Sequence, residues 1–298
     1  MPKAGIVTVV GKPNAGKSTL LNRIVGEKLS IVSPKPQSTR DRIVGIHTSD
    51  DIQLIILDTP GLLNPKYALQ EIMRGTALAA LAEADVVLYL VDGMEGAPAP
   101  LTTVANLERP VRAPIIVGIN KSDLIAEAKR ADLVATTAGS LGATDVRLLS
   151  AVTGEGVDEL LAAVGALMPD SPFLYPEDDI STQTVRFFVR ELIRETALEQ
   201  LSDEVPYSVA CEIEEFREGQ SPVYIRAVLH VERDSQKGIL IGAGGQRIRE
   251  IGRLSRQKIE AFVGSPVYLD LRVKVLANWR RNANALNRFG YKLPGEGA

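Results

Sequence analysis

The segment that most constrains this chain is Gly-x-x-x-x-Gly-Lys-Ser at residues 11–18, which lies between an apolar run at 5–10 and a helical segment at 17–25. Its glycines let backbone N–H groups approach a phosphate closely, and the N-terminus of the following helix favours negative charge. Such a loop is diagnostic only when a strand precedes it and a helix follows it. Both conditions hold, so the segment predicts a P-loop phosphate site in an α/β domain.

Two side chains of this loop have specific predicted roles. Lys17 is placed to bridge the β- and γ-phosphates, which makes it a candidate catalytic residue, and the Ser18 hydroxyl is placed to ligate Mg²⁺. The loop as a whole is predicted to contact the nucleotide through Gly11, Lys12, Pro13, Asn14, Ala15, Gly16, Lys17, Ser18 and Thr19.

The first 170 residues alternate short apolar runs with helical segments. The further runs are at 52–57, 86–91, 115–119 and 146–149, and the helical segments are at 17–25, 68–83, 122–141 and 156–167. This alternation predicts a mostly parallel sheet with helices on both faces. A run at 43–48, separated from 52–57 by Ser-Asp-Asp, predicts one antiparallel edge. We therefore expect an α/β P-loop domain over residues 1–170.

A second segment, Asp58-Thr59-Pro60-Gly61, ends the run at 52–57. An aspartate at such a strand end holds Mg²⁺ in P-loop proteins, so Asp58 joins Ser18 as a predicted metal-binding residue. The Gly61 N–H is placed to contact a γ-phosphate. Leu62 follows, where many GTPases carry a glutamine that orients the attacking water, and leucine cannot do this.

A third segment, Asn120-Lys121-Ser122-Asp123, follows the run at 115–119 and specifies the base. The Asp123 carboxylate can accept hydrogen bonds from guanine N1–H and from the 2-amino group, which adenine lacks. Losing charged hydrogen bonds in a closed site costs roughly 1.5–3 kcal/mol each. Asn120 and Lys121 would shape the pocket, and Ser150-Ala151 resembles the loop that contacts guanine O6. The sequence predicts guanine rather than adenine.

The chain beyond the Pro-rich break at 169–172 differs in pattern and in charge. We expect a linker at 171–182 and an α+β domain with a C-terminal helix over 183–298. Its expected elements are a helix at 184–201, strands at 207–216 and 223–232, a short turn or helix into Gly242, a helix at 246–262, a strand at 266–275 and a last helix at 276–288. Residues 1–180 carry 16 Lys/Arg and 22 Asp/Glu (−6), whereas residues 226–292 carry 14 and 5 (+9). The net charge of −3 therefore conceals a basic module suited to phosphate-rich partners.

The basic module contains Gly242-Ala243-Gly244-Gly245, a G-x-x-G loop between apolar residues and a helix. In KH domains such a loop clamps about four nucleotides of a single strand. The loop, the charge and the helix–strand–strand–helix–helix–strand order together predict a type II KH domain. Its helix should turn Ile248, Ile251, Ser255, Ile259 and Phe262 inward. The predicted RNA-binding residues are Lys237, Gly242, Ala243, Gly244, Gly245, Gln246, Arg247, Arg249 and Arg253.

These segments, with KPQSTRDRIVGIHT at 35–48 and FGY at 289–291, make nearly the whole chain resemble the bacterial Era GTPases. The resemblance implies a GTP-hydrolysing switch that binds the single-stranded 3′ end of 16S rRNA and assists small-subunit assembly, with no DNA partner. It implies that Thr39 is a switch threonine that ligates Mg²⁺ and acts in catalysis. Several bacterial GTPases that have Asn at the position of Asn14 use it to hold K⁺. The alternative role of Asn14 is structural, namely stabilisation of the loop.

The residues alone leave two other functions open. One is a GTPase that modifies tRNA or acts with protein partners, although the second domain has no catalytic Cys or metal cluster for such chemistry. The other is a non-enzymatic RNA-binding factor with GTP as a structural ligand.

The location is expected to be cytoplasmic. The chain has one cysteine, Cys211, no apolar run of 18 residues, and phosphate-binding chemistry by Gly11, which leaves no room for a signal peptide. Peripheral membrane contact is left open.

Overall fold

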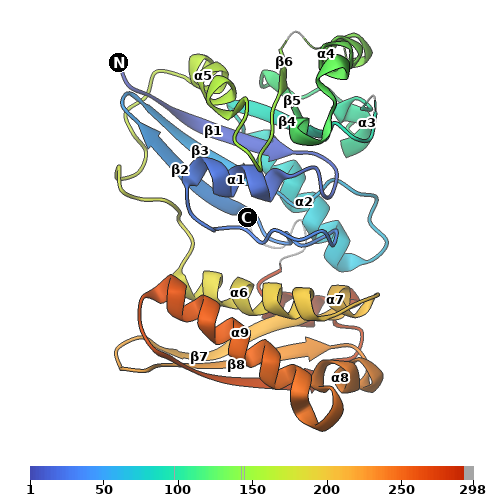
Figure 1. Cartoon of the computed structure of the whole chain (residues 1–298), viewed down its shortest axis with the longest axis vertical. Coiled ribbons are helices and arrows are strands. Elements are labelled where there is room, and N and C mark those ends of the chain that lie inside the picture. Colours follow the sequence, from blue (N-terminus) through green and yellow to red (C-terminus); the bar gives the residue numbers. More distant parts are fainter. Residues whose placement is uncertain (97, 142, 144, 292–298) are drawn as a thin grey trace. The chain divides into compact units, whose positions relative to one another are not determined.

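The computed structural model describes residues 1–96, 98–141, 143 and 145–291, and the chain divides into two compact units (Figure 1). The first comprises Met1–Pro65 and Met73–Thr182, and the second comprises Lys66–Ile72 together with the chain from Gln183 onward. Each unit has its own sheet and its own buried core.

The first unit is built on a six-stranded sheet in the order β2-β3-β1-β4-β5-β6. Only β2 is antiparallel to its neighbour β3, which confirms the predicted mostly parallel sheet with one antiparallel edge. Near-continuous Val, Ile and Leu make these strands suitable for burial on both faces. The strands are β1 (Lys3–Val10), β2 (Ile43–Ser49), β3 (Ile52–Asp58), β4 (Val86–Asp92), β5 (Ile115–Asn120) and β6 (Val146–Leu148).

Helices cover both faces of this sheet. Residues of α2, α3 and α4 pack against β4 and β5, whereas α1 packs on β2 through Leu21 and α5 packs on β3 through Gly165. The helices are α1 (Lys17–Val25), α2 (Ala68–Glu83), α3 (Leu101–Ala105), α4 (Glu127–Leu141) and α5 (Val157–Leu167). Helix α3 was not predicted.

The helix predicted over 122–141 is wrong at its start. Ser122–Leu124 forms a separate 3₁₀ turn, η1, and α4 begins only at Glu127. The break has a local cause, because Lys121 is left-handed (φ 69°) and Ile125 is extended (φ −102°, ψ 124°).

The segment predicted as a linker is held along the edge of the first sheet. The Ile46 N–H donates to the Ile180 carbonyl (2.9 Å), and the Ser181 hydroxyl donates to the Val44 carbonyl (2.5 Å). The Gln53 side chain accepts from the N–H groups of Leu174 (2.8 Å) and Tyr175 (3.0 Å). These contacts also occupy backbone groups of the edge strand β2.

The second unit has a three-stranded sheet in the order β7-β8-β9, with β7 antiparallel and β9 parallel to β8. Helices α6 and α9 pack on one face of this sheet, where alternate strand residues form the core (Figure 1). This mixed sheet confirms the predicted α+β class. Its elements are α6 (Val185–Gln200), α7 (Val205–Ser208), β7 (Ala210–Arg217), β8 (Val223–Val231), α8 (Asp234–Ile241), η2 (Ala243–Gly245), α9 (Gln246–Val263), β9 (Val267–Val275), η3 (Trp279–Arg281) and α10 (Ala283–Arg288).

Two predicted elements of this unit have different bounds. The strand expected from residue 207 begins at Ala210, because the short helix α7 precedes it. The helix expected over 276–288 is interrupted at Asn282, which is extended (φ −102°, ψ 114°) and whose side chain accepts from the Ala285 N–H. Asparagine favours this N-cap position, so a new helix starts there.

Three residues of types that often take part in chemistry have structural roles. Trp279 is fully buried and donates through Nε1 to the Ser208 carbonyl (2.8 Å). His230 is 2% exposed and bonded to Glu212 (2.9 Å). Cys211 lies in the core, and burial raises the pKa of its thiol to about 12, which keeps it protonated and inert.

Candidate functional site

The P-loop joins β1 to α1 and is shaped by close backbone approaches. Gly16 is left-handed (φ 95°), and a Cβ there would lie 2.1 Å from the Asn120 amide nitrogen, so only glycine fits. The buried Lys17 ammonium donates to the carbonyls of Gly11 (3.2 Å) and Lys12 (2.9 Å). Burial lowers the pKa of Lys17 to about 8. The loop thus holds a poorly solvated cation that an incoming phosphate would stabilise.

Three predicted metal ligands converge beside the loop. The Ser18 hydroxyl donates to Asp58 Oδ2 (2.7 Å) and lies 3.0 Å from the Thr39 hydroxyl. Asp58 is fully buried, and within the described residues no group donates to its Oδ1. Burial raises the pKa of the Asp58 carboxyl, against the opposing effects of the Lys17 charge and the hydroxyl donors. Two hydroxyls and an unsatisfied carboxylate oxygen form an oxygen donor set that fits Mg²⁺.

Two residues that support this set were not identified from the sequence. The buried Ser30 hydroxyl donates to Asp58 Oδ2 (2.8 Å). Asn22, at the end of α1, positions Ser30, because its Oδ1 accepts from the Leu29 (3.0 Å) and Ser30 (2.8 Å) N–H groups and its Nδ2 donates to the Ser30 carbonyl (2.8 Å). Asn22 therefore fixes the direction from which Ser30 holds Asp58.

The predicted base-binding residues come from β5 and from the loop after β6. The Asn120 amide donates to the Ala15 carbonyl (2.8 Å) and its Oδ1 accepts from the Ala151 N–H (2.9 Å), which ties three loops together. The Ser150 hydroxyl donates to Asp123 Oδ1 (2.6 Å), which leaves Oδ2 and the second lone pair of Oδ1 to accept from a ligand. Lys121 is left-handed and pairs with Asp92.

A clamp that the sequence did not reveal holds the loop that carries Asp123. Arg130 on α4 donates to the carbonyls of Ile125 (3.2 Å) and Ser122 (2.8 Å) and to Glu155 Oε1 (2.7 Å). Glu155 Oε2 accepts from the Ser122 hydroxyl (2.8 Å), and the Glu155 carbonyl accepts from the Ser150 N–H (2.9 Å). Arg130 and Glu155 therefore connect the two loops that would surround a guanine. Separately, Arg23 on α1 donates to the carbonyls of Ala151 (3.3 Å) and Val152.

We expect Arg130→Leu to weaken GDP and GTP binding by about 5- to 30-fold, because losing one or two hydrogen bonds that fix the loop costs about 1–2 kcal/mol. Lys129→Leu is the matched control, since Lys129 is exposed on the same helix and does not line the cavity described below. Titration with a fluorescent guanine nucleotide measures the nucleotide affinity of both variants. Equal affinities of the Arg130 variant and the parent chain would show that the clamp does not position the base-binding loop.

These groups surround one cavity of about 440 Å³. Gly61 also lines it, and a Cβ there would lie 2.7 Å from the Pro13 nitrogen. The Leu62 side chain is instead buried in the sheet core, so it does not face the cavity. Of the predicted nucleotide-binding and metal-binding residues, Gly11, Lys12, Ala15, Asp58 and Ser150 do not line this cavity, and those that do are Pro13, Asn14, Gly16, Lys17, Ser18, Thr19, Thr39, Gly61, Asn120, Lys121, Asp123 and Ala151.

The second unit presents the G-x-x-G loop at the start of α9. Gly242, Gly244 and Gly245 all have positive φ (71°, 56° and 78°), and Ala243 and Gly244 are exposed. Arg249 donates to the Gly244 carbonyl (2.8 Å) and Arg247 to the Ile239 carbonyl (2.8 Å). The loop therefore exposes backbone with basic side chains folded against it.

A groove of about 450 Å³ lies between α9 and the edge strand β9, and none of its lining residues is acidic. Two of the predicted RNA-binding residues, Arg249 and Arg253, line this groove. Arg256 lines it too and was not among the predicted residues. The predicted inward stripe of α9 is correct at Ile251, Ser255 and Ile259. It is wrong at Phe262, which is 38% exposed, while Ile248 is half-buried and lines the groove. Lys237, Gly242, Ala243, Gly244, Gly245, Gln246 and Arg247 lie outside the groove wall.

Comparison with known proteins places both units in described families. Residues 6–121 match the family described as 50S ribosome-binding GTPase, and residues 204–280 match the KH domain family. The chain is 41% identical over 291 residues to GTPase Era of Carboxydothermus hydrogenoformans, covering 97% of this chain and 98% of that protein. It is 40% identical to GTPase Era of Geobacter sp. strain M21 with the same coverage.

Two solved structures match nearly the whole chain. One is a crystal structure of Era in complex with MgGDPNP and nucleotides 1506–1542 of 16S ribosomal RNA, with a TM-score of 0.94, 40% identity, and coverage of 98% of this chain and 100% of that chain. The other is a variant of Aquifex aeolicus Era bound to GDP·AlF₄⁻, with a TM-score of 0.93, the same identity and the same coverage.

Proposed function

The chain belongs to the Era family of GTPases, and from this premise we propose that it is a GTP-hydrolysing switch that binds the 3′ end of 16S rRNA and assists small-subunit assembly. The observation that carries the proposal is the coexistence of a guanine-type nucleotide cavity in the first unit with an acid-free basic groove beside a G-x-x-G loop in the second. The relative crystallised with MgGDPNP and rRNA nucleotides supports both ligands.

In the first unit, we assign nucleotide positioning to the P-loop and base selection to Asp123. Lys17 would pair with the β- and γ-phosphates, and Ser18, Thr39 and Asp58 would hold Mg²⁺. When bound, Mg²⁺ would neutralise the negative charge that develops on the phosphate oxygens during hydrolysis. The Gly61 N–H would contact the γ-phosphate. Because Leu62 is buried in the core, another group must orient the attacking water.

We also propose that Asn14 holds a K⁺ ion that aids hydrolysis. Asn14 is left-handed (φ 64°) and its amide nitrogen donates to the Pro34 carbonyl (2.9 Å), so the side-chain oxygen is the atom that can offer lone pairs to a cation. A cation there would stabilise negative charge that builds up between the phosphates during hydrolysis.

The K⁺ proposal predicts several-fold faster hydrolysis in KCl than in NaCl at matched ionic strength. Asn14→Gly removes the side-chain oxygen while tolerating the left-handed backbone, so it should abolish the difference between the two salts. Phosphate release measured at saturating GTP checks this. Equal rates of the parent chain in both salts would leave Asn14 with only its loop contact.

In the second unit, we assign the clamping of single-stranded RNA to the exposed Ala243–Gly244 backbone and to Arg249 and Arg253. Backbone N–H groups and guanidiniums suit phosphates, and the apolar floor of the groove suits bases. Lys237, Gln246 and Arg247 stay part of the proposed RNA-binding set, although they do not line the groove.

Crosslinking the chain to RNA in cells and sequencing the bound fragments tests the rRNA assignment. We expect fragments from the 3′ end of 16S rRNA. Enrichment of tRNA instead would favour a GTPase that acts on tRNA. Multiple-turnover phosphate release tests the switch, because a factor that carries GTP as a structural ligand would release no more than one phosphate per chain.

We place the protein in the cytoplasm, where ribosomal subunits assemble. Within residues 1–96, 98–141, 143 and 145–291, no helix is long and apolar enough to cross a membrane. Cell fractionation separates a cytoplasmic pool from one in peripheral contact with a membrane.

A further inference from the structure

Two tyrosines stack across neighbouring strands at one end of the second sheet. Tyr224 on β8 and Tyr268 on β9 are register partners, with ring centroids 5.7 Å apart and planes inclined by 10°. Strand β9 is the edge of the sheet, and Tyr268 is 59% exposed. One ring face of Tyr268 therefore rests on Tyr224, and the other is directed past the edge of the sheet.

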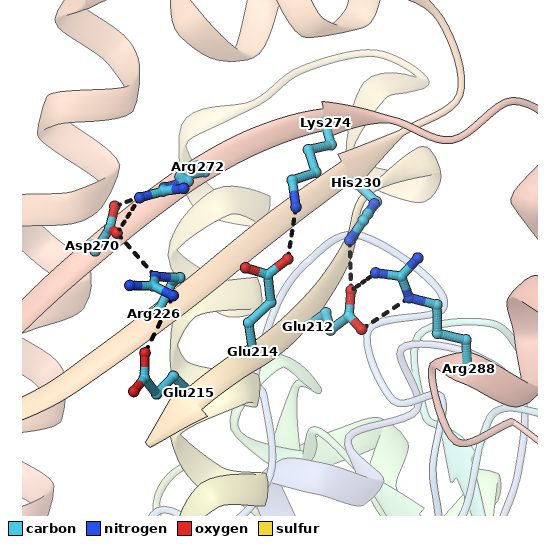
Figure 2. Close-up of polar contacts among 9 residues, drawn as sticks. All are labelled: Glu212, Glu214, Glu215, Arg226, His230, Asp270, Arg272, Lys274 and Arg288. Atoms are coloured by element: carbon cyan, nitrogen blue, oxygen red, sulfur yellow. Dashed lines mark hydrogen bonds and ion pairs between the residues drawn. The ribbon is translucent and has the colours of Figure 1, made fainter. Parts of the chain in front are cut away.

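The inner ring of this pair is fixed by arginines. The Arg226 guanidinium donates to the Tyr224 hydroxyl (2.8 Å) and lies 5.6 Å from its ring centre, and the Arg217 guanidinium lies 5.2 Å from it. Arg226 is itself held between Glu215 (3.2 Å) and Asp270 (3.3 Å), as Figure 2 shows. The Tyr224 ring is thus preorganised and supports the Tyr268 ring that stacks on it, which lowers the ordering cost of adding a third ring.

The rest of this sheet face is occupied by closed ion pairs (Figure 2). Glu212 accepts from Arg288 and contacts His230, and Glu214 accepts from Lys274 (2.7 Å). These carboxylates would repel a phosphate backbone that lay on this face. The aromatic pair is therefore the part of this face best suited to a nucleic acid.

Tyr268 also lines the groove between α9 and β9, together with Arg249, Arg253 and Arg256. A single strand that occupies the groove consequently passes the exposed tyrosine where it reaches the edge of β9. Bases of any identity stack on aromatic side chains, and such a contact strengthens binding by about 5- to 150-fold per base.

We propose that Tyr268, backed by Tyr224, is an aromatic step that stacks one unpaired base of the RNA strand lying in the groove. This site adds a nucleotide beyond those held by the G-x-x-G loop, and it rests on the proposed RNA-binding function. It selects for an unstacked base and not for a base identity, since the step contacts the base through its π-face.

An abasic scan of the RNA tests the step. The full chain is titrated by fluorescence anisotropy with single-stranded RNA of the 16S 3′-end sequence, intact or with one base removed at each position in turn. Tyr268→Leu keeps a bulky apolar side chain without a π-face, and Tyr268→Phe keeps the ring. We expect Tyr268→Leu to bind intact RNA at least about fivefold more weakly. At one RNA position, removal of the base should weaken binding to the parent chain but should not change the affinity of Tyr268→Leu. The Tyr268→Phe variant should behave like the parent chain.

If the parent chain binds the RNA and Tyr268→Leu binds it equally well, the stacking role of Tyr268 is overturned while the proposed function stands. The proposal is also overturned if Tyr268→Leu lowers the affinity for every abasic RNA by the same factor, since its effect would then not depend on a particular base. Failure of the parent chain to bind this RNA at all would overturn the proposed function and the step with it. The circular dichroism spectrum and the thermal unfolding of both variants should match those of the parent chain, which shows that the second unit is folded.

Discussion

Asp123→Asn should weaken GTP binding by about 100-fold or more and should improve the binding of xanthosine triphosphate. The Asp123 carboxylate would accept two hydrogen bonds from guanine, and charged hydrogen bonds contribute about 1.5–3 kcal/mol each. An asparagine amide can donate to the 2-oxo group of xanthine but not to the 2-amino group of guanine. The Ser150 hydroxyl, 2.6 Å from Asp123 Oδ1, is positioned to orient the replacement as it orients the carboxylate.

Titration of GTP and xanthosine triphosphate into the variant and the parent chain measures this exchange. Asp132→Asn is the matched control, because Asp132 is exposed on the neighbouring helix α4 and does not line the cavity. Unchanged GTP affinity of Asp123→Asn would remove Asp123 from base recognition. Loss of affinity for both nucleotides would mean that the substitution disturbs the loop and does not change selectivity.

Joint replacement of Ala243 and Gly244 by Asp should lower RNA affinity by roughly 1000-fold, since like charges placed against each other cost several kcal/mol. Both positions are exposed at the tip of the loop, and a Cβ at Gly244 would meet no atom within 4 Å. Gly244 has a φ of 56°, which Asp and Asn tolerate better than most residues. The loss should therefore come from charge.

Replacement of the same two residues by Asn is the control, because it adds nearly the same atoms without charge. Fluorescence anisotropy with single-stranded rRNA 3′-end sequence measures RNA binding, and GTP affinity should not change in either variant. If the Asn pair loses as much RNA affinity as the Asp pair, backbone shape and not charge is responsible. Full RNA affinity of the Asp pair would move the binding site away from this loop.

Much of the nucleotide site could be predicted because its residues occur in short segments at strand ends. In a parallel sheet the carboxyl ends of the strands lie at one edge, so segments at residues 11–18, 58–61 and 120–123 must come close together once the strand order is right. The groups at Lys17, Ser18 and Asp58 are accordingly adjacent in the structure. Local periodicity likewise predicted the buried residues Ile251, Ser255 and Ile259 of α9.

The groups that hold these segments in place could not be predicted in this way. Arg130 and Glu155 are 25 residues apart, and Ser30 and Asp58 are 28 apart. Of these four residues only Asp58 belongs to a recognisable segment, whereas Arg130, Glu155 and Ser30 occupy ordinary loop or helix positions in the sequence. Their partners are set by how α4, the loop before α5 and the loop after α1 pack, and no sequence period encodes that packing.

The amino-acid sequence alone predicted the chemistry: a phosphate loop, a carboxylate for guanine, and a glycine-rich loop in a basic module. It did so because backbone conformation and ligand chemistry restrict the residue types at these positions. The packed structure was needed to show that Leu62 is buried in the core, that residues 174–181 run along β2 and β3, and that Tyr268 stacks on Tyr224 at the edge of a groove. These features depend on contacts between strands and helices distant in the chain, where packing and hydrogen bonding select the partner.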